Sequence, residues 1–167
     1  EALLHPTPVN TSELARRMGL TIRAERITKS ASVFGQVFFA DCMVPVYDPE
    51  KDAYQDIAIE EGTMLVAPEV LVMRVIGSFN NTIIHECVHW DLHKKFFELE
   101  KLYNKEARSI SCQVQEGTRP ERNRTPLDWM EWQANVLAPR IDQIKLMFLG
   151  EKENNMKKKI KSGCSVR

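Results

Sequence analysis

Hydrophobic and polar positions alternate along much of the first half of the chain and follow a helical period along the second half. Alternation with a period of two is typical of a strand with one buried face, whereas apolar residues three and four positions apart indicate a helix. The pattern therefore predicts a short helix, a small sheet and then two long helices. The expected strands cover residues 20–26, 33–40, 43–47, 57–59 and 63–67.

The short helix and the first loop have clear local signals. Asn10 or Thr11 can cap a helix over residues 12–18, and Gly19 can end it because glycine readily adopts the left-handed conformation. Residues 48–56 are polar and contain a proline, so we expect a loop there.

The first long helix is expected from about residue 81 to about residue 106. Pro68 suits the first turn of a preceding short helix that runs to Ile76, and Gly77 should interrupt it. Apolar residues surround the axis of the first half of the long helix, so this half should be buried. The polar stretch 109–124 is then expected to form an excursion between the two long helices.

The second long helix has a strong start signal. Thr125 suits the N-cap, Pro126 the first helical position and Asp128 the third, so Thr125 and Asp128 can form a capping box. Pro139 is expected to end or kink this helix. The residues expected to face the core are Leu127, Met130, Ala134, Leu137 and Ile141.

Together these elements predict an α+β fold, in which a small, twisted, mostly antiparallel sheet packs on a long buried helix and a second helix. A chain of 167 residues is the usual length of one domain, which we place at residues 1–150. Residues 151–167 carry six lysines and arginines against two glutamates, so we expect a basic, flexible tail.

Composition excludes several classes of function. The net charge is zero, with 23 basic and 23 acidic residues, so no overall field favours direct nucleic acid binding. No apolar run approaches the length of a membrane span, and no signal peptide is recognisable. The four cysteines form no Cys-x-x-Cys pair, which favours reduced thiols. We therefore expect a cytoplasmic protein without a membrane partner.

Candidate chemistry is concentrated in the His-Glu-x-x-His motif of the first long helix. His85 and His89 lie four residues apart, so both imidazoles can reach one ion from the same helix face. Glu86 is adjacent and suits a general base acting on a metal-bound water. The alternative is a pair of core histidines hydrogen-bonded to backbone or carboxylate groups. Metal binding is favoured, because unpaired buried ionisable groups are costly.

A catalytic zinc needs a third protein ligand, for which Glu131 is the candidate. It lies on the apolar stripe of the second helix, beside Met130 and one turn before Ala134, where an unpaired carboxylate is poorly tolerated. A buried salt bridge or a hydrogen bond to a backbone amide is the alternative. Asp128 is the competing carboxylate, but its capping position already explains it.

His93 follows His89 by four further residues. Because His85 and His93 would be about 12 Å apart along the helix axis, they cannot share one ion. His93 either lines the cleft and hydrogen-bonds a substrate or a group that contacts the metal ligands, or is merely structural. His93, Tyr103 and Arg140 are unranked candidates for stabilising an oxyanion.

The two helical motifs resemble the ImmA/IrrE family of metallopeptidases, which pairs His-Glu-x-x-His with a later Glu-x-x-Ala-Asn helix. The matching residues run from His85 to His89, with His93 downstream, and over residues 131–139. The similarity covers about residues 11–141, and only the two helical motifs are specific.

This resemblance implies a gluzincin-like minimal metallopeptidase that holds one catalytic Zn²⁺. Val88 stands where the family usually has glycine, and the proline usual after the glutamate helix is missing at residues 141–144. The family also implies a cytosolic regulatory protease that cleaves a DNA-binding repressor. By analogy the metal ligands are His85, His89 and Glu131, and the catalytic acid/base is Glu86.

The sequence therefore predicts zinc-dependent hydrolysis of a protein or peptide substrate, which could pair with an exposed sheet edge at residues 63–67. One alternative is a metal-bearing interaction module that has lost catalysis. Another is a metal-dependent hydrolase of a non-peptide substrate, because the motif specifies water activation and not the substrate. Manganese or iron could also occupy the same ligands.

Overall fold

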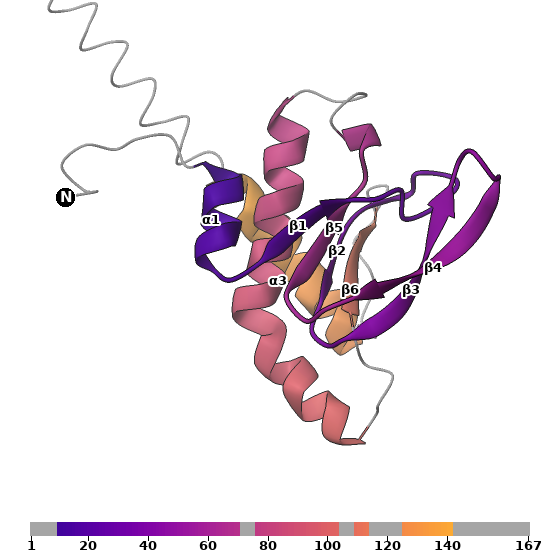
Figure 1. The fold of residues 1–167 in the computed structure, drawn as a ribbon. Coiled ribbons are helices and arrows are strands. Elements are labelled where there is room, and N and C mark those ends of the chain that lie inside the picture. The colour runs from indigo at the N-terminus through magenta and orange to yellow at the C-terminus, as the bar shows by residue number, and fades with distance from the viewer. Residues whose placement is uncertain (1–9, 71–75, 104–108, 114–124, 142–167) are drawn as a thin grey trace, which may run out of the picture.

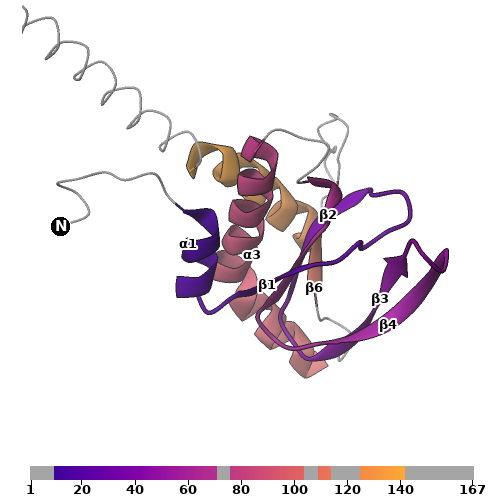
Figure 2. The same ribbon diagram turned by 45° about the horizontal axis from the view of Figure 1, so that its top comes forward.

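The computed structural model describes residues 10–70, 76–103, 109–113 and 125–141, and these form an α+β architecture (Figure 1). Figure 2 shows three layers, with the helices on one side of a sheet and a two-stranded ribbon on the other. The coarse fold class expected from the sequence is therefore confirmed.

The middle layer is a four-stranded sheet. Its strands are β1 (Thr21–Ala24), β2 (Val33–Phe38), β5 (Thr63–Val66) and β6 (Ser109–Gln113). They lie in the order β1-β5-β2-β6, where β1 and β5 are parallel and the other two pairings are antiparallel. Strands β1, β2 and β5 fall within the ranges that hydrophobic alternation predicts.

The ribbon consists of β3 (Cys42–Asp48) and β4 (Ala53–Ile59), paired antiparallel as a separate two-stranded sheet. The prediction of one sheet is therefore wrong, and so is the loop expected over residues 48–56, because β4 already begins at Ala53. Most residues of β4 are exposed, and only Ile59 is buried. Residues 57–59 were predicted as a strand, whereas residues 53–56 are all exposed and show no hydrophobic alternation by which they could be recognised.

Strand β6 corrects a second prediction. Residues 109–124 were expected to be an excursion, but Ser109–Gln113 pairs antiparallel with β2, so that Ile110 lies opposite Val37. The pairing is made by backbone groups, which the polar sequence of this strand does not reveal. Residues 114–124 lie outside the described residues.

Helix α1 (Thr11–Arg17) begins as expected. The Asn10 side chain caps it by accepting a hydrogen bond from the Glu13 backbone N–H at 3.1 Å. Gly19 follows with φ +80°, the left-handed conformation expected at the end of a helix.

Helix α3 (Ile76–Tyr103) begins earlier than predicted. Gly77 lies inside the helix and does not interrupt it. The expected end at residue 106 lies outside the described residues, as does most of the short helix expected after Pro68, of which residues 69–70 are helical. Ile83, Ile84, Cys87 and Val88 of α3 are buried as expected, but Leu92, which was expected to be buried too, is 51% exposed, so burial does not extend all round this part of the helix.

Residues 126–141 form the last described helix. The capping box is confirmed, since the Thr125 N–H donates to Asp128 Oδ2 at 2.8 Å and the Asp128 N–H donates to Thr125 Oγ1 at 3.2 Å. Met130 and Ala134 are buried as expected, whereas Leu127 faces solvent. The helix also continues past Pro139, whose ring lies on its exposed side.

The sheet separates two apolar clusters because alternate residues of a strand point to opposite faces. On β5, Met64 and Val66 pack toward α3 together with Ile83 and Cys87. Leu65 faces the ribbon, in a cluster with Phe38, Val44, Val46 and Ile59. Every residue of β5 is buried, as expected of a strand covered on both faces.

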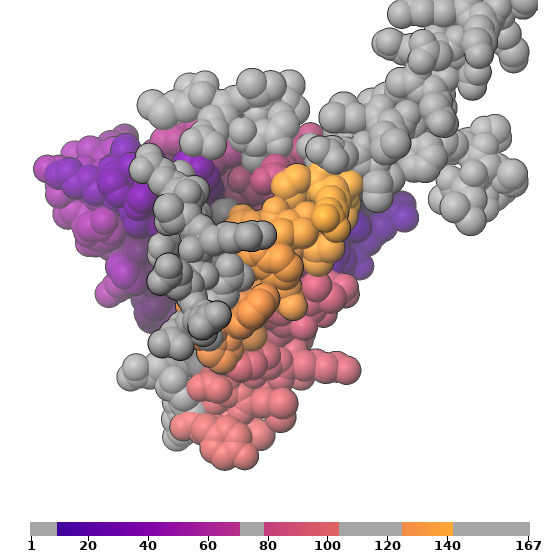
Figure 3. Space-filling view, turned by 180° about the vertical axis from the view of Figure 1, so that it is seen from behind, coloured from indigo at the N-terminus to yellow at the C-terminus, as the bar shows by residue number. Residues whose placement is uncertain are grey.

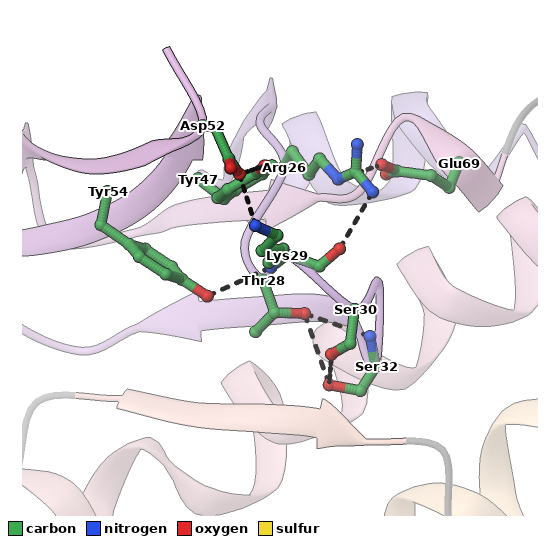
Figure 4. A network of polar contacts seen from close by, with 9 residues as sticks. All are labelled: Arg26, Thr28, Lys29, Ser30, Ser32, Tyr47, Asp52, Tyr54 and Glu69. Carbon is green, nitrogen blue, oxygen red and sulfur yellow. Dashed lines mark hydrogen bonds and ion pairs between the residues drawn. The ribbon is translucent and has the colours of Figure 1, made fainter. Parts of the chain in front are cut away.

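A polar network holds the ribbon to the loop between β1 and β2 (Figure 4). The Tyr47 backbone N–H donates to Arg26 O at 2.8 Å, and the Lys29 N–H donates to Tyr54 Oη at 3.1 Å. The Lys29 ammonium also pairs with Asp52 at 2.5 Å. These residues, Arg26, Lys29, Tyr47, Asp52 and Tyr54, are called the ribbon network below.

No helix among the described residues is long and apolar enough to cross a membrane. Cys87 is a buried free cysteine. The domain boundary predicted at residue 150 and the basic tail over residues 151–167 lie outside the described residues.

Candidate metal centre

The candidate site begins with a polar stripe on the buried face of α3. His85, His89 and His93 lie at four-residue intervals, so their side chains follow one another along the same face. All three are buried, and so is Glu86, whose side chain has no exposed surface. An interior this polar is unusual, because ionisable side chains are rarely fully buried without partners.

The third side chain comes from helix 126–141. Glu131 Oε2 lies 3.4 Å from His85 Nε2, and Glu131 Oε1 lies 3.4 Å from His89 Nε2. The two Nε2 atoms are 2.9 Å apart. One ligand atom from each of the three residues therefore lies within 4.8 Å of the others. The structure thus brings together the three residues predicted as ligands.

A small apolar cluster joins the two helices beside these residues. Ile84 and Val88 of α3 pack against Ala134 and Ala138, both of which are fully buried. Alanine side chains let the helix backbones approach closely, which places Glu131 within reach of α3. Val88, which stands where the resembling family has glycine, belongs to this cluster. Figure 3 shows helix 126–141, in orange, lying over α3.

The protonation states of His89 and Glu131 suit a cation. Burial lowers the pKa of His89 to about 4, so its imidazole is neutral at pH 7. Burial alone would raise the pKa of Glu131, but its contacts with His85 and His89 outweigh this effect and lower the pKa to about 2. A neutral imidazole beside an ionised carboxylate is the combination that metal binding requires.

The three side chains also fit a metal by their chemistry. Glu131 Oε1 is buried and makes no hydrogen bond. Nitrogen lone pairs and a carboxylate that converge in this way repel one another unless a proton or a cation lies between them. Two imidazoles and one carboxylate are a ligand set found in catalytic zinc sites that keep a further position open.

Glu86 lies under strand β2. A Cβ atom added to Gly35 would lie 2.6 Å from Glu86 Oε1 and 2.8 Å from Thr82 Cγ2, closer than real Cβ contacts allow. Only glycine therefore lets β2 pass over the carboxylate. Gly35 was not among the residues predicted from the sequence, although a glycine inside a predicted strand can indicate a close approach of this kind.

His93 contacts the far side of His89. The two Nδ1 atoms are 2.9 Å apart, and His93 Nε2 lies 2.9 Å from Gln133 Oε1. The structure thus places His93 between His89 and Gln133, and its role at a metal site stays a prediction. Gln133 was not predicted from the sequence. It follows Glu131 by two residues, and residues two apart on a helix point in different directions, so helical periodicity does not connect them.

Two other predicted residues are not brought to this cluster. Tyr103 is 89% exposed at the end of α3, about 21 Å from His89 at the rise of an α-helix. Arg140 is exposed, about 13 Å beyond Glu131 along its helix. The substrate edge expected at residues 63–67 is also wrong, because β5 is paired on both sides, with β1 and with β2.

Comparison of the chain with protein-family models, with curated proteins and with solved structures found no match. The resemblance to the ImmA/IrrE family therefore remains a prediction from the two helical motifs.

Proposed function

We propose that this chain is a zinc-dependent metallopeptidase. One observation carries the proposal: His85 and His89 from α3 and Glu131 from helix 126–141 converge within 4.8 Å. These residues are far apart in the sequence, and their convergence requires both helices to be docked. A ligand set of two histidines and one glutamate favours zinc over the hard cations calcium and magnesium, which prefer oxygen ligands.

The residues have separate roles in this proposal. His85, His89 and Glu131 hold the ion, and Glu86 accepts a proton from the attacking water and passes it to the leaving amine. A bound zinc ion would lower the pKa of the water and polarise the scissile carbonyl. Gly35 leaves the space in which the Glu86 carboxylate lies.

A peptide is the substrate class that the sheet would suit. Strand β6 is at one end of the four-stranded sheet and, among the described strands, pairs only with β2. An extended peptide could add to this sheet through backbone hydrogen bonds. The register supports this edge, since Cys112 of β6 lies opposite Gly35, the residue above Glu86.

Our proposal includes membership of the ImmA/IrrE family. The two motifs that resemble ImmA/IrrE are the ones that supply the converging side chains. By that resemblance the chain would be a gluzincin-like, cytosolic regulatory protease whose substrate is a DNA-binding repressor.

The test combines metal analysis with a cleavage screen. The purified wild-type chain should contain one zinc per molecule by mass spectrometry and should cleave members of a peptide library. Glu86→Gln should keep the zinc and lose at least about 100-fold in turnover, because general-base catalysis is removed. Glu98→Gln is the matched control, since Glu98 is an exposed glutamate on the same helix. Unchanged turnover in Glu86→Gln would exclude Glu86 from the mechanism.

The complete burial of Glu86 favours a second candidate function, a metal-bearing interaction module without catalysis. A buried carboxylate under β2 could serve the packing of that strand alone. A wild-type protein that binds zinc and cleaves no peptide at any tested concentration would support this second function and reject the first.

A further inference from the structure

A chain of hydrogen bonds extends from the candidate ligand His89 to the surface of helix 126–141. It runs from His89 Nδ1 to His93 Nδ1 at 2.9 Å, and from His93 Nε2 to Gln133 Oε1 at 2.9 Å. His89 and His93 are buried, whereas Gln133 is an exposed residue. The other nitrogen of His89, Nε2, faces His85 and Glu131.

The direction of each hydrogen bond follows from Gln133, the last residue of this series. An amide oxygen only accepts, so His93 Nε2 must carry a proton. A neutral imidazole carries one proton, which leaves His93 Nδ1 as an acceptor. His89 Nδ1 must then be the donor, and the lone pair of His89 Nε2 is left facing the cluster.

We propose that Gln133 and His93 are positioning residues that hold His89 in the tautomer with its proton on Nδ1, so that Nε2 is free to bind the metal. Zinc as the ion rests on the proposed function above. The tautomer itself is a property of the metal-free protein and is tested without metal.

The orientation of the Gln133 amide determines which nitrogen of His89 carries the proton. With the amide nitrogen toward His93, each hydrogen bond would reverse, and the proton of His89 would move to Nε2. That tautomer has no lone pair for an ion on the side of His85 and Glu131. Position 133 therefore requires an acceptor, which glutamine or glutamate supplies and leucine does not.

The first experiment measures the tautomer. In the metal-free wild-type protein, ¹⁵N-detected two-dimensional spectra of the histidine rings should show His89 with its proton on Nδ1 and His93 with its proton on Nε2. The Gln133→Leu variant should show a mixture of tautomers for His93 and His89. Finding the proton of His89 on Nε2 in the wild type would overturn the inference.

The second experiment measures zinc affinity by competition with a chelator. Gln133→Leu should bind zinc about 10- to 100-fold more weakly, the usual effect of losing a group that orients a ligand. Because Gln133 is exposed, this variant should fold, which its circular dichroism would verify. Gln55→Leu is the matched control, an exposed glutamine of β4 outside the cluster.

Gln133→Glu separates the hydrogen bond from the shape of the side chain. It keeps an acceptor, so the wild-type tautomers should persist in the metal-free spectrum, where the added charge cannot act through an ion. If Gln133→Leu leaves both the tautomers and the affinity unchanged, the inference is rejected. If the wild type binds no zinc at all, the proposed function fails, and the metal-free spectra still decide the inference.

Discussion

Two polar regions of this molecule use similar side chains in opposite surroundings. In the candidate metal centre, His85 is 1% exposed and its partner Glu131 is 14% exposed, with 3.4 Å between nitrogen and oxygen. In the ribbon network, Lys29 and Asp52 are 61% and 67% exposed, and their contact is shorter, at 2.5 Å. The shorter contact lies in the region where water competes most strongly for both groups.

The free energy of such a pair depends more on how deeply it is buried than on the distance between its nitrogen and oxygen atoms. Exposed ion pairs contribute little to stability, because solvent screens them and because ordering two long side chains costs entropy. Buried ionisable groups cost free energy unless they are paired or bind an ion. Several of them on one helix face therefore make a candidate site, whereas the ribbon network requires no function to explain it.

The largest effect should follow from removing Glu131, the candidate ligand on helix 126–141. Glu131→Ala should abolish the rise in melting temperature that zinc gives the wild-type protein. That rise corresponds to about 2.7 kcal/mol when the zinc concentration is 100 times Kd. Thermal unfolding with and without zinc measures it, and Glu98→Ala is the exposed control. Wild-type zinc affinity in Glu131→Ala would show that the buried cluster is not a metal site.

An intermediate effect should follow from adding a methyl group under β2. Gly35→Ala places Cβ 2.6 Å from Glu86 Oε1, so the strand or the carboxylate must move. We expect a loss of about 1–3 kcal/mol in the free energy of unfolding, together with lower peptidase activity. Gly19→Ala is the control, since open space surrounds it and it should cost only the backbone strain of about 1 kcal/mol. A fully stable, fully active Gly35→Ala would contradict the close approach.

The smallest effect should follow from breaking the ribbon network. Lys29→Met removes the ion pair with Asp52, but both side chains are exposed, so the melting temperature should change little and zinc affinity not at all. The hydrogen bonds from Lys29 and Tyr47 hold the pKa of Asp52 below its usual 3.8. An Asp52 carboxylate with a lowered pKa stabilises the fold above pH 3.8, the usual pKa. Any difference in melting temperature between Lys29→Met and the wild type should therefore shrink below pH 3.8 and disappear once Asp52 is protonated in the folded protein. A loss as large as that of Gly35→Ala would contradict the comparison.

Local signals in the sequence identified the elements that bury a regular apolar face. Strand β5 and the first turn of helix 126–141 are examples, because hydrophobic alternation and the Thr125–Asp128 capping box act over a few residues. Strand β6 was missed because its pairing depends on backbone hydrogen bonds to β2, a strand far away in the sequence. Of β4 only residues 57–59 were predicted, because its first four residues are exposed and show no pattern.

The candidate site, like the fold, could be predicted from the sequence only in part. His85, His89 and Glu131 could be identified because ionisable residues at buried helical positions are conspicuous in a sequence. Gln133 could not, since it acts through His93, and Gly35 gave only the general signal of a glycine inside a strand, which does not reveal that Glu86 lies beneath it. Both depend on which helix and which strand approach α3, a tertiary arrangement that a single sequence does not specify.

The unequal division of the three candidate ligands between two helices has a consequence for the order in which the protein unfolds. His85 and His89 keep their spacing wherever α3 is helical, but Glu131 reaches them only while the Ile84, Val88, Ala134 and Ala138 cluster holds. An ion bound by all three would thus act as a cross-link between α3 and helix 126–141. When a chelator takes that ion away, residues 126–141 would be the first to detach, before the sheet loses any strand.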